Sequence, residues 1–424
     1  MKVLVVGSGG REHALSWRLG QSASVDQVYC VPGNAGMGAE FSCLPADVSS
    51  NSEIASLAES LAVDLTVIGP EAPLTAGIVD EFGSRHLAIV GPSTDGAQLE
   101  GSKIFAKEFM QRHGIPTAEF ALIENESDLD ANLSRFGYPV ALKADGLAAG
   151  KGVVIVKDET EARRTAAALL SGEIAGDAGR RFLVEEFLKG EEVSFIALSD
   201  GVGFYNFPPT QDHKPAFDND EGPNTGGMGA YCDPAILSSA VRDAVVRTIV
   251  EPTLNGVRET GSPFKGFLYC GLMMTAEGPK VLEYNVRLGD PETQPLMYRM
   301  TGDLGQLLLS AAHGELDTAS VAWKDEPTAC VVMASQGYPG AYAKGRLITG
   351  LASAEAKGAK VFHAGTRFQE GKIATAGGRV LGVTAAGEDL SAAIANTYAA
   401  VQEIHFDGVH FRRDIGKKGL RRRS

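Results

Sequence analysis

Residues 282–295, LEYNVRLGDPETQP, carry the pattern that decides the fold and points to the chemistry of this chain. In an extended strand, side chains two positions apart share a face, so Glu283, Asn285 and Arg287 should form one polar row. The opposite face should pack in a core and consists of Tyr284, Val286 and Leu288. Carboxylate and amide oxygens are the ligands that magnesium prefers, and a guanidinium binds phosphate oxygens. The row therefore predicts metal-assisted phosphate chemistry, whereas the plainer interpretation is an ordinary amphipathic strand.

Upstream, residues 139–157, PVALKADGLAAGKGVVIVK, contain two β-rich runs joined by a loop of glycine and alanine, which predicts a hairpin. Gly146, Gly150 and Gly152, with Lys151 at the tip, would let backbone amides approach a polyphosphate. The loop is not a Walker A motif, because Gly152 runs into the strand VVIV rather than into a helix. We expect a mobile flap that covers phosphates, and the alternative is a mobile turn without a ligand.

The segment VEEFLKGEEVSF, residues 184–195, follows an apolar run with acidic residues. Glu185, Glu186 and Leu188 lie at the end of this run, and extended backbone beyond a strand can offer adenine a paired donor and acceptor. Glu192, four residues beyond Leu188, could accept hydrogen bonds from both ribose hydroxyls. A solvated acidic turn is the alternative for this stretch alone.

The first hundred residues alternate short apolar strands, KVLVV, QVYCV, LTVIG and LAIVG, with helical stretches, which is typical of a parallel α/β sheet. The loops GSGGREH, PGNAGMG, GPEAPL and GPST follow these strands at the edge where open α/β sheets bind ligands. GSGGREH should open a helix and could bind a phosphate, or it could be a tight turn without a ligand. Glu12 occupies a position where the dinucleotide fingerprint requires a small residue, so NAD is disfavoured.

The composition is that of an ordinary globular protein with 424 residues, 44% hydrophobic and 22% charged. This length exceeds the roughly 250–300 residues of a single core, so several domains are expected.

A net charge of −14 argues against a nucleic-acid-binding protein, and the basic end RRDIGKKGLRRRS is interpreted as a solvated terminus. No apolar run approaches the roughly 20 residues of a membrane span, and no signal peptide is recognised, so cytoplasm is expected. The five scattered cysteines lack a CxxC pair and are expected to be reduced core thiols.

Taken together and in order, these segments make the chain similar to the ATP-grasp ligases over nearly its whole length. The segments that carry the resemblance are VVGSGGREHAL, GPEAPL, KADGLAAGKGV, VEEFLKGEEVSF, QDHK, NTGGMGAY, NVRLGDPETQP, TAGGRVLGVTA and FRRDIG. The resemblance implies a multidomain α/β and α+β fold, with an N-terminal parallel α/β (pre-ATP-grasp) domain over residues 1–102. An ATP-grasp domain over residues 103–324 would include a mobile hairpin subdomain at 116–190 that clamps the nucleotide. A small α+β lobe would cover residues 325–424.

The resemblance also implies a ligase that forms a carbon–nitrogen bond. It would join glycine to 5-phosphoribosylamine through a glycyl phosphate, giving glycinamide ribonucleotide, ADP and phosphate in purine (IMP) biosynthesis. ATP and Mg²⁺ or Mn²⁺ would be required as cofactors. The protein would bind small molecules, not nucleic acid or membrane, and would be a monomer or a weak homodimer. The alternatives are another ATP-grasp carboxylate–amine ligase or a carboxylase, and a non-catalytic nucleotide-binding regulator, which would lack the polar row.

By matching motif positions, the resemblance assigns roles to residues of this chain. Those implied to bind the nucleotide are Lys143, Gly150, Lys151, Gly152, Glu185, Glu186, Leu188 and Glu192. Those implied to bind the metal are Glu283 and Asn285. Those implied to be catalytic are Arg287 and Lys214, around the transferring phosphoryl group, and Asp212, which could instead meet the glycine ammonium. Those implied to bind the substrates are Gly9, Gly10, Arg11, Glu12, Asn34, Pro70, Glu71, Asn224, Thr225, Gly226, Gly227, Met228, Asp290, Pro291 and Glu292.

Overall fold

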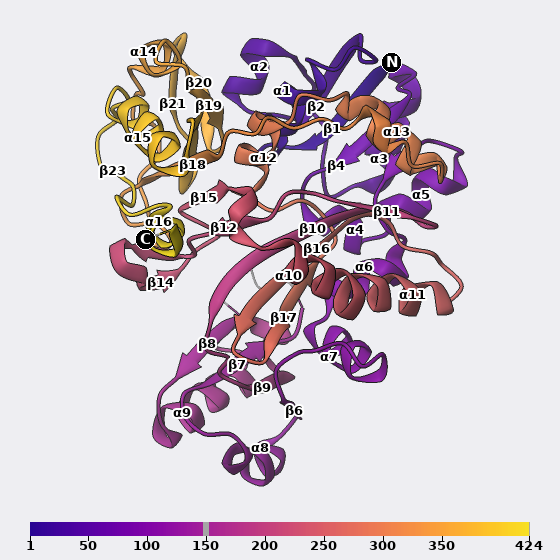
Figure 1. Ribbon diagram of the computed structural model, residues 1–424, viewed down its shortest axis with the longest axis vertical. Helices are drawn as coiled ribbons and strands as arrows, with labels where there is room; N and C mark the ends of the chain where they lie inside the picture. The colour runs from indigo at the N-terminus through magenta and orange to yellow at the C-terminus, as the bar shows by residue number, and fades with distance from the viewer. Residues whose placement is uncertain (147–151, 424) are drawn as a thin grey trace.

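The computed structural model describes residues 1–146 and 152–423 (Figure 1). The tip of the expected flap, including Gly150 and Lys151, lies outside the described residues. Within them, no helix is both long enough and apolar enough to cross a membrane.

The N-terminal segment forms a parallel sheet with the strand order β3-β2-β1-β4-β5, as the alternating pattern predicted. Its strands are β1 (Lys2–Gly7), β2 (Gln27–Pro32), β3 (Ser42–Cys43), β4 (Leu65–Ile68) and β5 (Ile89–Val90). Its helices are α1 (Gly10–Leu19), α2 (Ala35–Glu40), α3 (Asn51–Leu61), α4 (Glu71–Thr75), α5 (Ile78–Ser84) and α6 (Thr94–Gly101). Strand β3 was not anticipated, because so short a strand shows no periodicity.

The glycines around the first turn of α1 make room for a buried carboxylate. Glu12 is 2% exposed, accepts a hydrogen bond from the Gly9 amide at 2.5 Å and pairs with Arg11 Nε at 2.6 Å. A Cβ atom added at Gly7 or Gly69 would overlap the Glu12 side chain. The Gly9 amide of GSGGREH therefore already donates to Glu12, and phosphate binding by the other amides of this loop stays a prediction.

A second unit, which we call the clamp, follows helix α7 (Lys103–Arg112) and lies at the bottom of Figure 1. Its antiparallel sheet has the order β6-β9-β7-β8, and its own apolar core includes Leu142, Leu169 and Phe182. Its elements are β6 (Phe120–Ile123), α8 (Glu126–Asn132), β7 (Val140–Ala144), β8 (Val153–Val156), α9 (Glu159–Leu170) and β9 (Phe182–Glu186). The predicted hairpin is confirmed, since β7 and β8 pair from Val140 opposite Val156 to Lys143 opposite Val153.

The central sheet is antiparallel, with the order β17-β16-β10-β12-β15-β18-β22-β19. Its strands are β10 (Glu191–Asp200), β12 (Thr210–Asp212), β15 (Gly229–Cys232), β16 (Lys265–Thr275), β17 (Gly278–Asn285), β18 (Thr328–Ser335), β19 (Lys360–His363) and β22 (Arg379–Ala386), with β11 (Phe204–Asn206) and β23 (Val409–His410) attached to β10 and β18. Because β15 pairs with β18, the sheet continues from the middle of the chain into its C-terminal lobe.

Helices and short hairpins cover this sheet. The helices are α10 (Ser239–Val245), α11 (Glu251–Glu259), α12 (Thr293–Arg299), α13 (Leu304–His313), α14 (Leu351–Glu355), α15 (Leu390–Val401) and α16 (Lys417–Arg423), with a π-helical turn (Val246–Val250) between α10 and α11. The hairpins are β13 (Pro215–Phe217) with β14 (Glu221–Asn224) and β20 (Thr366–Gln369) with β21 (Lys372–Thr375). Leu4 of the N-terminal sheet shares one apolar core with Phe195 and Leu268 of the central sheet, so the two sheets are packed together.

The cysteines are free, as predicted for reduced thiols. Cys30, Cys232, Cys270 and Cys330 are buried, but Cys43 is only partly buried, so the expectation of a core position is wrong for Cys43.

Gly69→Ala tests the role of the glycines around Glu12. The added methyl group would displace a buried, hydrogen-bonded carboxylate, so the free energy of unfolding should fall by about 1–3 kcal/mol. Gly83→Ala in α5 is the matched control, because a Cβ there meets nothing within 4 Å and should leave stability equal or slightly higher. Urea denaturation of both variants measures this, and equal losses would contradict it.

Candidate active site

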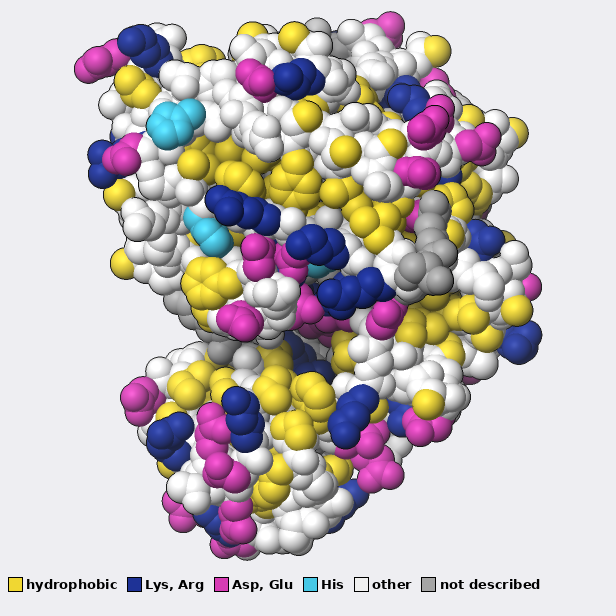
Figure 2. All heavy atoms as spheres, turned by 60° about the vertical axis from the view of Figure 1, so that its left-hand side comes forward, with side chains coloured by type: hydrophobic (Ala, Val, Ile, Leu, Met, Phe, Trp, Pro, Cys, Tyr) yellow, Lys and Arg dark blue, Asp and Glu magenta, His cyan; other side chains and the backbone are white. Residues whose placement is uncertain are grey.

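Two adjoining pockets form the candidate site. The inner pocket lies in a cleft between the clamp and the rest of the molecule, and Figure 2 shows charged side chains around the opening of this cleft. The outer pocket lies beside it, between the N-terminal segment, the central sheet and the C-terminal lobe. The inner pocket has a volume of about 150 Å³ and the outer pocket about 660 Å³. They share Glu71, Glu283, Asn285 and Arg287, so the predicted polar row forms the boundary between them.

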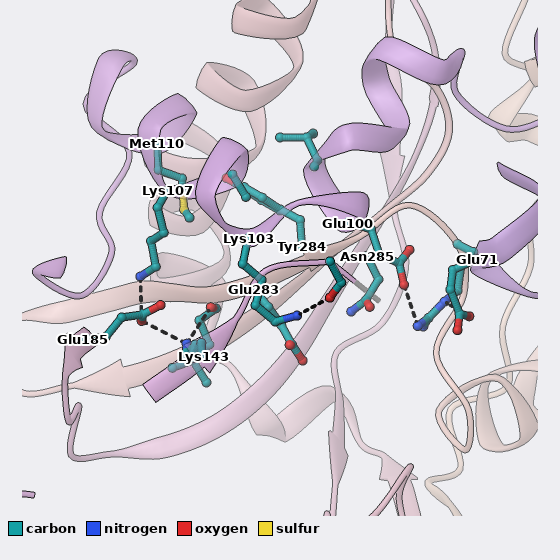
Figure 3. Close-up of a pocket in the computed structure, with 15 residues that line it drawn as sticks. Glu71, Glu100, Lys103, Lys107, Met110, Lys143, Glu185, Glu283, Tyr284 and Asn285 are labelled. Carbon is teal, nitrogen blue, oxygen red and sulfur yellow. Dashed lines mark hydrogen bonds and ion pairs between the residues drawn. The ribbon is translucent and has the colours of Figure 1, made fainter. Parts of the chain in front are cut away.

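The inner pocket is lined by charged side chains from several elements (Figure 3). Lys103 and Lys107 come from α7, Lys143 from β7, and Glu185 from the end of β9. The amines of Lys107 and Lys143 lie 2.8 and 2.9 Å from Glu185 Oε2. Glu185 Oε1 is buried and has no hydrogen-bond partner among the described residues, so this carboxylate can still accept a donor from a ligand.

Lys103 and Lys107 were missed by the sequence analysis. Their spacing of four residues puts both on one helix face, which is a weak signal that could have indicated them. Burial lowers the pKa of Lys107 to about 8, although Glu185 acts in the opposite direction. An additional anion in the pocket would favour the charged form of this amine.

The polar row on β17 has the predicted alternation. Glu283, Asn285 and Arg287 line the pockets. Tyr284, Val286 and Leu288 are 1–2% exposed and pack in the core, and Tyr284 also touches the inner pocket. The strand itself ends at Asn285, so Arg287 lies just beyond it.

Arg287 is held by acidic residues of the N-terminal segment. Its Nη2 atom lies 2.7 Å from Glu100 and its Nε atom 3.5 Å from Glu71. Burial acts to lower the pKa of Arg287, but these two carboxylates raise it above its ordinary value. The guanidinium therefore stays charged at the wall that both pockets share.

Lys214 connects two carboxylates that sequence reasoning had given separate roles. Its amine donates hydrogen bonds to Glu192 and, at 3.1 Å, to Glu283. Lys214 is the main cause that lowers the pKa of Glu283 to about 2. Burial acts to lower the pKa of Lys214, yet Glu192 and Glu283 raise it well above its ordinary value. The predicted ribose-binding and metal-binding carboxylates are thus tied together by one ammonium.

The outer pocket brings acids and amides together beside the N-terminal loop. Glu292 is 3% exposed and accepts hydrogen bonds from Ser194 at 2.9 Å and Tyr269 at 2.6 Å. Burial, and next the charge of Glu292, raise the pKa of Asp212 well above its ordinary value. Arg11 lines the same pocket and donates to the Leu288 carbonyl at 3.1 Å.

The C-terminal lobe completes the wall of the outer pocket. Arg379 Nη1 donates to the carbonyls of Gly226 at 2.5 Å and Asp290 at 2.6 Å, and its Nη2 lies 3.2 Å from the Asp290 carboxylate. The Tyr338 hydroxyl accepts from the Gly226 amide at 3.2 Å. Both residues were missed by the sequence analysis, because a contact across more than a hundred residues leaves no local spacing pattern.

The two pockets gather most of the predicted site. The predicted residues that line them are Gly9, Arg11, Glu12, Pro70, Glu71, Lys143, Glu185, Asp212, Lys214, Thr225, Gly226, Glu283, Asn285, Arg287, Asp290 and Glu292. The predicted residues that the structure describes but places outside these linings are Gly10, Asn34, Gly152, Glu186, Leu188, Glu192, Asn224, Gly227, Met228 and Pro291.

Some of these outer residues already have structural partners. The Asn34 side chain caps α2 and donates to the carbonyls of Ser8 and His363. Met228 is fully buried, and its amide donates to the His213 carbonyl, so neither its side chain nor its amide faces a ligand. We therefore correct the expected ligand contact at Met228 to a packing position.

Comparison with known proteins places the whole chain in one family. Family profiles for phosphoribosylglycinamide synthetase match as the N domain over residues 1–100, the ATP-grasp (A) domain over 101–293 and the C domain over 328–418. A phosphoribosylamine–glycine ligase of Pseudomonas aeruginosa is 47% identical over 425 residues, covering 100% of this chain and 99% of that protein.

Solved structures agree with the sequence comparison. The crystal structure of a phosphoribosylamine–glycine ligase from Thermotoga maritima superposes with a TM-score of 0.85 at 34% identity, covering 98% of this chain and 100% of that one. A biotin carboxylase domain from Hydrogenobacter thermophilus shares the fold alone, with a TM-score of 0.72 at 15% identity over 97% of this chain and 91% of that one. The chain belongs to the phosphoribosylglycinamide synthetase family.

Proposed function

We propose that this protein is an ATP-dependent ligase that joins glycine to 5-phosphoribosylamine and releases glycinamide ribonucleotide, ADP and phosphate. The observation that carries the proposal is the cationic inner pocket, which adjoins an outer pocket lined by both acidic and basic side chains. Three relatives that match along the full chain are phosphoribosylamine–glycine ligases. The proposed reaction is a step of purine biosynthesis. Another ATP-grasp ligase or carboxylase is disfavoured, since the carboxylases share only 14–18% identity.

The inner pocket suits the nucleotide. Lys103, Lys107 and Lys143 supply positive charge for its phosphates, and the unpartnered Glu185 Oε1 can accept from the adenine amino group. Leu188 follows β9 and could offer backbone groups to the same base. Glu192 would accept from the ribose hydroxyls once Lys214 leaves it.

A divalent metal fits Glu283 and Asn285 only together with the nucleotide. The described residues contain no group of three or more His, Cys, Asp or Glu side chains that could hold a metal ion on its own. Magnesium, however, commonly binds through one or two protein oxygens plus phosphate oxygens and water, which is what this pair offers. When bound, Mg²⁺ or Mn²⁺ would neutralise phosphate charge during phosphoryl transfer.

The chemistry requires cations at the boundary of the two pockets. We propose that the glycine carboxylate attacks the γ-phosphate to give a glycyl phosphate, which the amine of phosphoribosylamine then attacks. At an effective dielectric near 20, one like-charge contact at about 4 Å costs roughly 4 kcal/mol. Lys214 and Arg287 lie where they can offset this repulsion, and Lys143 approaches from the clamp side. Closure of the clamp would keep water from the acyl phosphate.

Asp212 faces the outer pocket, where a carboxylate could accept from the glycine ammonium. Bound cations would favour the charged form of Asp212, which burial and Glu292 disfavour. Function in the cytoplasm, as a monomer or weak homodimer without nucleic acid, remains a prediction of the sequence.

The direct test measures ATP-dependent phosphate release by the purified protein with magnesium. Release should require both glycine and freshly generated phosphoribosylamine and should equal the amount of amide product. Release that is independent of glycine, or its complete absence, would contradict the proposal.

Glu283→Gln tests the metal assignment. Loss of the anionic ligand should lower kcat by about a hundredfold or more and raise the magnesium concentration needed for half-maximal rate, with an unchanged fold. Glu277→Gln, at an exposed turn beside the same strand, is the matched control and should leave both values unaltered. Activity of both variants is measured against magnesium concentration, and full activity of Glu283→Gln at limiting magnesium would exclude this role.

The pKa of Lys107, about 8, predicts how nucleotide binding depends on pH. Below that pH the amine is charged and attracts phosphates, whereas above it the charge is lost. The KM for ATP should therefore rise with pH, by about tenfold between pH 7 and pH 9.5.

Lys107→Arg provides the control for this pH dependence, because arginine stays charged over the whole range. Its KM for ATP should stay nearly constant across the series, whereas Lys280→Arg, outside the pockets, should keep the rise. A similar rise in the Lys107→Arg protein would show that another group is responsible.

A further inference from the structure

A third hollow lies apart from the proposed active site and shares no lining residue with the inner or outer pocket. It has a volume of about 400 Å³, within the usual range for small-molecule sites. Its walls come from β11 and the segment after it, from α10, from the end of α12 and from the segment that carries Trp323. We call it the aromatic cavity.

Aromatic side chains form one side of this cavity. Trp323 Nε1 donates to the Tyr205 hydroxyl at 2.9 Å, which fixes both rings. Phe207 packs edge-on against each of them, with ring centroids 5.8 Å from Tyr205 and 5.5 Å from Trp323. Tyr205 and Trp323 are only partly buried, so ring surface remains accessible to a planar molecule.

A buried arginine lies on the other side without a carboxylate partner. Arg299 is 4% exposed, yet its guanidinium forms no ion pair with any described residue. Among these residues, its one hydrogen bond runs from Nη1 to Cys232 Sγ at 3.7 Å. Its Nε atom is buried and has no hydrogen-bond partner in the described part of the chain. A buried cation left unpaired is costly, so an anion beside it would be stabilising.

The remaining polar groups of the cavity add a second cation and an acceptor. Asn206 Oδ1 is buried and has no partner among the residues described. Arg242 also lines the cavity, and its guanidinium donates only to Ser239 Oγ at 3.3 Å. Asp243 is the acid in the lining, but it is exposed and therefore hydrated, so it opposes an anion weakly.

We propose that the aromatic cavity binds a small anion that carries a flat aromatic ring. Arg299 would meet the anionic group, the ring would lie against Tyr205 and Trp323, and a ring substituent could donate to Asn206 Oδ1. This site is independent of the ligase reaction proposed above, because no residue of the cavity lines the nucleotide or substrate pockets.

The tryptophan content allows a direct binding measurement. The chain has two tryptophans, and Trp17, which stacks on Tyr298, lies outside the cavity. In a Trp17→Phe background, Trp323 is the sole tryptophan and reports on the cavity. Phenyl phosphate is titrated with ATP and magnesium present at saturation, so that the nucleotide site is filled. A saturable change in Trp323 emission is expected, and inorganic phosphate should bind at least about tenfold more weakly.

Arg299→Gln in the same background separates a specific site from quenching in solution. Affinity for phenyl phosphate should fall by about tenfold or more, because the charged donor is lost, while ligase activity is unchanged. If that variant does not fold, Tyr205→Leu serves instead and should weaken binding through the lost ring contact. Three results would overturn the proposal. They are quenching of Trp323 emission that rises linearly with phenyl phosphate, an affinity for phenyl phosphate that the folded variant leaves unaltered, and binding of inorganic phosphate as tight as that of phenyl phosphate.

Discussion

The two-faced strand β17 is the constraint on which the proposed active site depends. Tyr284, Val286 and Leu288 are anchored in the core, so Glu283, Asn285 and Arg287 must face the cleft. Pairing with β16 fixes this register, with Gly271 opposite Glu283 and Tyr269 opposite Asn285. A slip by one residue would bury a carboxylate and an amide and expose three apolar side chains, which is strongly disfavoured. The core thus determines where the proposed metal ligands lie.

Paired charges, buried or partly buried, line the site where catalysis is proposed. Glu185 holds two lysines, Glu100 holds Arg287, and Lys214 joins Glu192 to Glu283. Such pairs contribute little net stability, because desolvation offsets most of the Coulomb attraction. Their value is in binding, since each cation is already placed for a polyanion and needs little reorganisation. The exchange of Lys214 from carboxylates to a ligand would couple nucleotide binding to assembly of the site.

Substrate specificity depends on what surrounds the shared fold. The central architecture also occurs in a biotin carboxylase domain at 15% identity, so the fold by itself does not determine the substrate. The outer pocket, by contrast, combines the N-terminal loop with Arg379 and Tyr338 of the C-terminal lobe. Because β15 and β18 pair in one sheet, the C-terminal lobe is anchored next to Gly226, where Arg379 and Tyr338 make their hydrogen bonds.

The sequence by itself determined the parallel N-terminal sheet, the β7–β8 hairpin and the alternation on β17, because each follows from local periodicity and turn residues. Through family motifs it also indicated about half of the residues that line the two pockets. Only the tertiary structure decided three contacts of the site. The Gly9 amide donates to Glu12, Lys107 and Lys143 both pair with Glu185, and Arg379 pairs with Asp290. These contacts depend on how packed elements meet, and burial and charge pairing between distant segments leave no periodic signal in a single sequence.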